Sequence, residues 1–190
     1  MIWGQFTSVE NQIRKESGAL KDLLLFSNQL KETVREPMVR AIKTYARAVV
    51  ETEWRALADN EATEKTDRLF HEVISSVTNI KSENDTERML YERLLDIANQ
   101  ASAHRDERLS LSAKRMPQTL FLFVTLTAST ILFLLFFYPF RNAALGIVSI
   151  AITATLLFFA HFVLTDLDNP FERAWNVGSE PFGELITSLR

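Results

Sequence analysis

The chain has 190 residues, no cysteine, and 21 lysine and arginine residues against 24 aspartate and glutamate residues. The lack of cysteine excludes a disulfide framework, a thiolate zinc site and a cysteine nucleophile. The net charge of −3 lacks the basic excess that nucleic-acid binding needs, so no nucleic-acid partner is expected.

Four amphipathic helices and no strand are expected in a soluble domain over residues 1–116. The first helix, over residues 10–29, places its apolar residues at steps of three and four. Pro37 is expected in the first turn of the second helix, because proline is tolerated there. The apolar stripe of this second helix continues to Leu57, and Trp54 is expected to dock it on its neighbours.

The third and fourth helices follow the polar residues 59–65. Apolar residues recur at helical spacing from Leu69 to Ile80, and a fourth helix is expected to start near Thr86. No Gly or Pro interrupts residues 86–116, so this helix is expected to run to Pro117 and to enter the membrane across a kink.

Two uncharged apolar runs then predict a transmembrane hairpin over residues 117–165. Each run, over about 120–138 and 143–165, is long enough to cross a hydrocarbon core of about 30 Å. Pro139 opposes helix continuation between them, and Arg141 can remain in water. A buried pair of soluble helices is the alternative, but two such runs would overfill the core of a small domain.

The orientation of the hairpin follows from the cations near its spans. Four basic residues precede the first span, and only Arg141 lies in the loop. Basic residues are enriched on the cytoplasmic side, which predicts a multi-pass protein of the cell membrane with its soluble domain and both termini in the cytoplasm. The four basic residues are Arg105, Arg108, Lys114 and Arg115.

No catalytic, metal-binding or cofactor-binding constellation is recognisable in the sequence. His71, His104 and His161 have no partner in a metal-ligand spacing. Carboxylates such as Glu51 and Glu53 are assigned to the solvated faces of amphipathic helices, not to a general acid and base pair. We therefore expect no enzyme, no metal and no cofactor.

One face of the second span is partly polar. Ser149, Thr153, His161 and Thr165 fall on positions four or eight residues apart along it. Hydroxyl groups in membranes usually hold helices together, so helix packing is favoured over a conduction path as the role of this stripe. His161 could line a watery vestibule or reach the interface, and both readings stay open.

The residues after the second span, 166–190, are expected to form a tail packed on the soluble domain. Asp166 and Asp168 could attract cations in an oligomer or could pair with arginines of the soluble domain, and we favour the pairing. The expected partners are the four cations that precede the first span. The tail anchors are Pro170, Phe171, Trp175 and Phe182, with Pro181 as a second fixed point.

The order of these features resembles the bestrophin-like family of bacterial membrane proteins. A four-helix soluble region containing Tyr45, Val49, Val50, Glu53 and Trp54 precedes two spans and a tail with Asp-Leu-Asp-Asn-Pro-Phe and Ser-Glu-Pro-Phe. The resemblance covers nearly the whole chain. It implies a shortened N-terminus, since members carry one or two further membrane helices ahead of the soluble region. It also implies a Gly soon after Pro-Phe, where this chain has Glu172, Arg173 and Ala174.

Two functions of different classes are expected from these features. The first is a homo-oligomeric membrane assembly that conducts or regulates ions, since a single hairpin cannot enclose a pore. The alternative is a non-conducting, membrane-anchored helical module that recruits or senses a cytoplasmic protein. A membrane enzyme ranks third. The expected partners are the lipid bilayer, further copies of the chain and a cytoplasmic protein.

Overall fold

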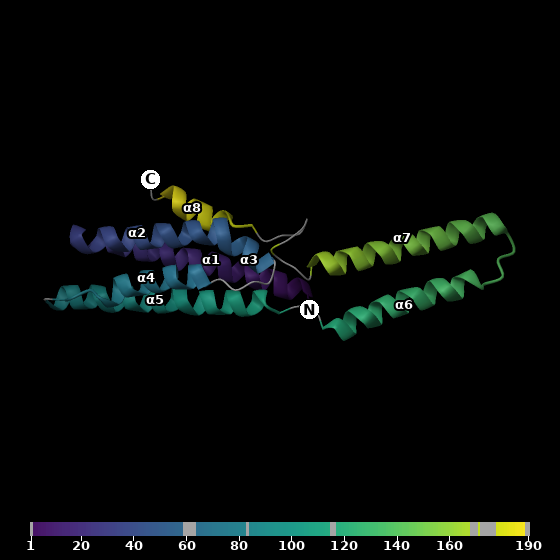
Figure 1. The fold of residues 1–190 in the computed structure, drawn as a ribbon, viewed down its shortest axis with the longest axis horizontal. Helices are drawn as coiled ribbons and strands as arrows, with labels where there is room; N and C mark the ends of the chain where they lie inside the picture. Colours follow the sequence, from purple (N-terminus) through teal and green to yellow (C-terminus); the bar gives the residue numbers. More distant parts are fainter. Residues whose placement is uncertain are drawn as a thin grey trace.

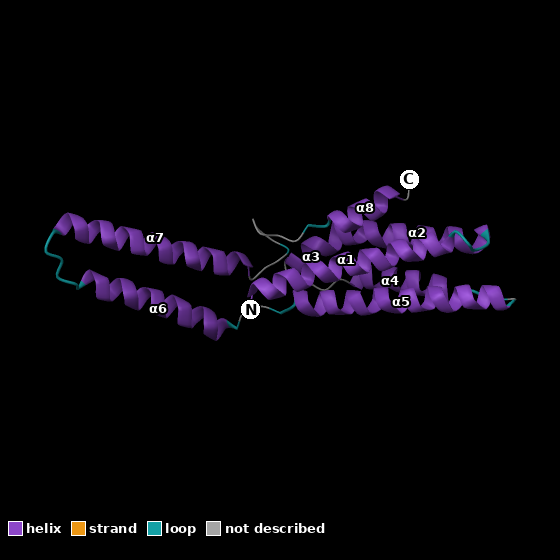
Figure 2. Ribbon diagram, turned by 180° about the vertical axis from the view of Figure 1, so that it is seen from behind, coloured by secondary structure: helices purple, strands orange, loops and turns teal. Residues whose placement is uncertain are grey.

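The computed structural model describes residues 2–58, 64–82, 84–114, 117–167, 171 and 178–188. These residues form helices and their connections, without a strand, as the sequence predicts (Figure 2). The helices are α1 (Ile2–Ser27), α2 (Glu32–Ala48), α3 (Trp54–Ala58), α4 (Glu64–Thr78), α5 (Asp85–Ser112), α6 (Gln118–Phe136), α7 (Ala143–Leu167) and α8 (Glu180–Ser188). A π-helical turn, η1 (Val49–Glu53), joins α2 to α3.

Four helices form a bundle. α1 packs along α5 and α2 packs along α4, while α1 also contacts α2 and α4 also contacts α5. α2 and α5 therefore occupy opposite corners of the bundle, as Figure 1 shows. α8 lies in the groove between α1 and α2 and adds a fifth element to this side.

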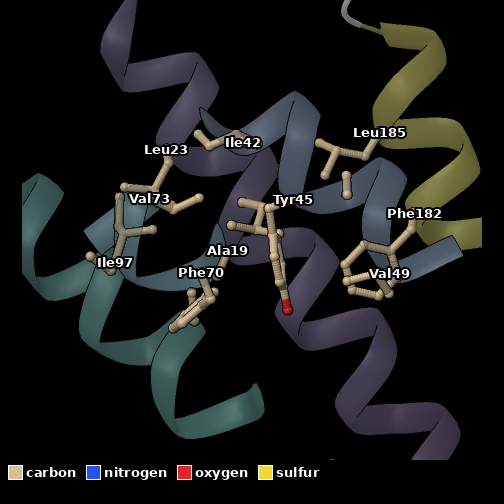
Figure 3. Close-up of a cluster of buried hydrophobic side chains, with 14 of the residues drawn as sticks. Ala19, Leu23, Ile42, Tyr45, Val49, Phe70, Val73, Ile97, Phe182 and Leu185 are labelled. Atoms are coloured by element: carbon tan, nitrogen blue, oxygen red, sulfur yellow. The ribbon is translucent and has the colours of Figure 1, made fainter. Parts of the chain in front are cut away.

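The apolar stripes of the helices meet in one core. Ile13 and Leu23 of α1, Ile42 of α2, Val73 of α4 and Ile97 of α5 are all buried. Figure 3 shows most of these side chains pointing toward one another between the helices. The helical period in the sequence therefore located the core faces of the bundle correctly.

The second helix begins earlier than expected. α2 starts at Glu32, so Pro37 lies inside it and not in its first turn. Proline has no N–H, and the carbonyl of Thr33 therefore lacks its usual helical partner. Both Thr33 and Pro37 are exposed, so water can hydrate this carbonyl at little cost.

The fourth helix ends before the apolar hairpin. Its start is capped by Asn84, whose side chain accepts a hydrogen bond from the Glu87 backbone N–H at 2.8 Å. The helix ends at Ser112, and Lys114 is not helical, so the predicted continuous helix up to Pro117 is wrong. Pro117 opposes a continuous helix into α6, because proline removes a helical hydrogen bond and disfavours helix in the residue before it.

α6 and α7 form an antiparallel hairpin that projects from one end of the bundle (Figure 1). Both are long and apolar enough to cross a membrane, and the apolar windows are 0% buried inside the molecule. The connecting turn is close-packed, because the Phe140 ring covers Gly146 so tightly that a Cβ there would lie 2.9 Å from it. Asn142 caps α7 by accepting a hydrogen bond from the Ala144 N–H at 2.9 Å.

Candidate functional site: a buried ion-pair network

Charged side chains from different helices meet inside the bundle, near the end that carries the hairpin. Glu16, Glu53 and Arg108 are fully buried, and Arg105 is 3% exposed. Charged residues are rarely buried to this degree unless they are paired, so the group must be largely self-satisfying. The members are Glu16 of α1, Tyr45 of α2, Glu53 of η1, Asp67 of α4, and Arg105 and Arg108 of α5.

The π-helical turn places Glu53 in this group. In a regular α-helix, a residue eight positions after Tyr45 would lie about 80° away from it around the axis. The wider turn of η1 reduces the rotation per residue and brings Glu53 back toward the face that carries Tyr45. The carboxylate consequently points into the bundle, and its assignment to a solvated face was wrong, whereas Glu51 is exposed as predicted.

Arg108 joins two carboxylates from different elements. Its Nε donates to Oε2 of Glu16 at 2.6 Å, and its Nη2 donates to Oε1 of Glu53 at 2.5 Å. Charge-assisted bonds of this length are among the stronger interactions in proteins. Through Arg108, helix α5 therefore holds both α1 and η1.

Arg105 extends the network to two further helices. Its Nη1 donates to the Tyr45 hydroxyl at 2.9 Å and to Oε2 of Glu53 at 3.1 Å. Its Nη2 donates to the half-exposed Asp67 of α4. The Tyr45 hydroxyl in turn donates to Glu16, so Tyr45, Glu16, Arg108, Glu53 and Arg105 form a closed ring of hydrogen bonds.

Aromatic rings cover both guanidinium groups. The Arg105 guanidinium carbon lies 5.4 Å from the Tyr45 ring centre and 5.3 Å from that of Phe70. These distances fall within the range of cation–π attraction, which strengthens when the groups are desolvated. The Arg108 guanidinium lies 5.9 Å from the Trp54 ring and 5.8 Å from that of Phe182, so α8 supplies part of its cover.

The electrostatic environment keeps Glu53 and the two arginines ionised. Burial favours the neutral form of Glu53, but Arg108 and Arg105 outweigh it, and the pKa of Glu53 is lowered. Burial and the neighbouring Glu16 carboxylate raise the pKa of Tyr45 well above its ordinary value. Burial opposes the charge of Arg108, yet Glu16 and Glu53 raise its pKa. The phenol therefore stays neutral and acts as a hydrogen-bond donor.

The lowered pKa of Glu53 predicts an acid-dependent loss of stability. The folded state binds this proton less readily than the unfolded state, so its stabilising effect is complete above the ordinary value of 4.5 and is lost as the pH falls below it. We expect the purified chain in detergent to lose more stability between neutral pH and about pH 4 than a Glu53→Gln variant does. Thermal unfolding followed by circular dichroism at both pH values measures the difference, and equal losses in the two proteins would contradict it.

The arrangement suits a structural role better than chemistry. Two buried carboxylates balance two buried guanidinium groups, and each carboxylate is already bound by an arginine. Among the described residues, no group of three metal-ligating side chains is close enough to hold an ion. The network therefore ties α1, α2, η1, α4 and α5 together at one level of the bundle.

The sequence interpretation missed this network, although a signal was present. Glu16 falls between Ile13 and Leu20 on the buried stripe of α1. Arg105 and Arg108 continue the buried stripe of α5 past Ala101. A charged residue at a core-facing position requires a partner of opposite charge, which could have directed attention to these positions.

The tail residues fall partly outside the described residues, as Asp168, Pro170 and Trp175 do. Phe171 is buried with its ring centre 5.4 Å from that of Trp54, and Phe182 is buried in the core. Asp166 is also buried. Glu16, Glu53 and Asp67 bind Arg105 and Arg108. The pairing of the tail aspartates with the four cations stays a prediction, because Asp168 and Arg115 lie outside the described residues.

The polar stripe of α7 lies along α6. Ser149 and Thr153 line a cavity of about 370 Å³ between the two helices, near their connecting turn. At the other end, the His161 ring packs on Phe121 of α6 at 4.7 Å between ring centres. The Thr165 hydroxyl donates to the His161 carbonyl at 2.8 Å and so remains within its own helix.

The bundle, the hairpin and the start of α8 match a family model described as the bestrophin-like domain, over residues 1–182. The chain belongs to the bestrophin-like family. The match includes all members of the buried network and the apolar hairpin, and it ends at Phe182. The suspected family is thereby confirmed. Comparisons of this bestrophin-like chain with curated proteins and with solved structures give no match.

Proposed function

We propose that this bestrophin-like protein is a multi-pass membrane protein whose hairpins assemble in several copies around an ion path. The α6–α7 hairpin spans the bilayer, and the helical bundle with both chain ends lies in the cytoplasm. One hairpin cannot surround a pore, so conduction requires further copies of the chain. The relation of the family to bestrophin channels supports a channel-like assembly over an enzyme.

The observation that carries this proposal is the uncovered apolar surface of the hairpin. Large apolar residues such as Phe123, Phe136 and Phe158 are 65%, 73% and 73% exposed. In water, each would forgo roughly 1.5 to 3 kcal/mol of burial free energy. A bilayer removes this cost, and the span lengths suit its hydrocarbon core.

The polar face of α7 supports conduction within such an assembly. Ser149, Thr153 and His161 place hydroxyl and imidazole groups on the side that faces α6 and the cavity. Ionisable groups within membrane spans commonly mark ion paths, and His161 is the ionisable residue on this face. Rearrangement of neighbouring hairpins around this face would give ions a polar route.

A second candidate function, a non-conducting anchored module, is favoured by the hydroxyl groups of α6. Thr125, Thr127, Ser129 and Thr130 each donate to the carbonyl four residues earlier in their own helix. The hydrogen-bonding capacity of these hydroxyl groups is therefore satisfied within the helix, so they can face lipid and do not require contact with water. In that case the bundle would present its surface to a cytoplasmic protein while the hairpin only holds it at the membrane.

An ion-flux measurement on the full chain in liposomes separates the two functions. We expect flux from the unmodified chain, and a changed rate for Thr153→Val and for His161→Ala, because both remove polar groups from the proposed path. Thr155→Val is the matched control, since its hydroxyl donates to the Ala151 carbonyl and the residue is exposed away from the cavity. Absence of flux from folded, oligomeric protein would remove the conduction proposal and leave the anchored module.

A further inference from the structure

An unpaired basic face lies along the exposed side of α2. Arg40, Lys43 and Arg47 recur about one turn apart, with Arg40 and Arg47 exposed and Lys43 partly exposed. These three form no ion pair among the described residues, whereas Arg14 and Lys21 of α1 are bound by carboxylates. We call these three residues the basic face.

A short acidic face lies on the exposed side of α5. Asp106 and Glu107 are exposed and form no ion pair among the described residues. The exposed residues one turn to either side on this face are uncharged and small, Ala103 and Ser110. Neither carboxylate is therefore held in an ion pair within the described residues, and the small neighbours would allow another helix to approach closely.

The fold places these two faces on opposite corners and at similar heights. α2 and α5 occupy opposite corners of the bundle, and both run toward the hairpin (Figure 1). The hydrogen bond between Arg105 and Tyr45, at 2.9 Å, shows that these two positions lie at the same level. Arg47 and Asp106, close to them in sequence, consequently lie at comparable heights above the hairpin.

We propose that the basic face of α2 docks on the acidic face of α5 of a second copy of this chain. A contact between different faces on opposite corners is head-to-tail, so it repeats from copy to copy and closes into a ring if the rotation allows. Equal heights keep every hairpin in the same bilayer. The inference rests on the proposed function for its need of several copies, and it supplies the contact that assembles them.

Charge complementarity and the direction of the basic face select this occupant. Lipid headgroups could reach only the end of α2 nearest the hairpin, because the rest of this helix extends along the bundle to its far end (Figure 2). Glu36 and Glu51 lie just beyond the ends of the basic face, which limits it to the span of about 10 Å between Arg40 and Arg47. Asp106 and Glu107 are adjacent, so they can pair with part of the basic face, and such a short acidic face suits this limited span better than an extended polyanion does.

Cysteine cross-linking tests the contact directly, since the chain has no cysteine of its own. We expect the Arg47→Cys and Asp106→Cys double variant of the full chain, in liposomes, to form a ladder of disulfide-linked species under mild oxidation. A mixture of the two single variants should give dimers only, and each single variant alone should give none. Arg47→Cys combined with Ser75→Cys, on the exposed side of α4, is the control and should stay uncross-linked.

Charge reversal gives an independent measurement. Asp106→Lys with Glu107→Lys should weaken association of the full chain by roughly tenfold or more, and adding Arg40→Glu with Arg47→Glu should restore it. The protein could be oligomeric by mass in detergent, yet form no cross-links and keep its association unchanged after charge reversal. That result would overturn the proposed contact but not the proposed function. A strictly monomeric chain would overturn the proposed conduction as well. Cross-linked rings without ion flux would support the contact and remove only the conduction.

Discussion

Replacing Arg108 with methionine is expected to lower the free energy of unfolding by about 3 to 5 kcal/mol. Methionine fills much of the same volume but leaves the carboxylates of Glu16 and Glu53 without their shared partner. Neither carboxylate can reach water, because both are fully buried. Denaturant unfolding of the purified chain in detergent, followed by circular dichroism, measures the change.

The matched control is Arg14→Met, which removes an arginine from the surface of the same bundle. Arg14 is paired with Glu10 one turn away at 2.7 Å, but its side chain is 69% exposed. Solvent screens such a pair, so the expected change is within about 0.5 kcal/mol. Equal losses in the two variants would show that burial of the Arg108 network does not stabilise the fold.

Replacing Phe182 with alanine is expected to cost about 3 to 5 kcal/mol and to release α8 from the bundle. Phe182 is fully buried and packs edge-on against Tyr45 and Trp54, at 6.4 and 6.2 Å between ring centres. Figure 3 shows it pointing from α8 toward α2, beside Val49. Its loss would also remove one of the two rings that cover Arg108.

Hydrogen exchange measures the release of α8 separately from global unfolding. The backbone amides of residues 183–188 should lose protection in the Phe182→Ala variant, since few other buried side chains hold this helix. Thr187→Ala is the control, because the Thr187 hydroxyl is exposed and donates only to Gly183 in its own helix. Unchanged protection in Phe182→Ala would mean that Leu185 and the Ser17 hydrogen bond to Pro181 suffice to hold α8.

The chain enters and leaves the hairpin close to the buried network. Arg105 and Arg108 lie in the last two turns of α5, and the chain enters α6 a few residues later. Phe171 and Phe182 follow α7 in the chain and pack on Trp54, next to η1. Both ends of the hairpin thus lead to the part of the bundle that holds the network.

The order of the four bundle helices, their core faces and the apolar hairpin could be predicted from the amino-acid sequence, whereas the start of α2 and the end of α5 could not. Helical periodicity is a local property, and each stripe must be buried whatever its partner is, so Ile13, Ile42 and Val73 were placed correctly. The two apolar runs are recognisable by length and the absence of charge alone. The order of the soluble helices, the two spans and the tail motifs likewise suggested the family.

The pairing of the buried charges was decided by the tertiary structure. Which arginine meets which carboxylate depends on which helices are neighbours, and no spacing within one helix contains that information. Glu53 shows this most clearly, because a wider turn rotates it from the expected solvated face into the core. These charges are buried because each forms an ion pair with a residue of another helix, and such pairs form only when the chain has folded.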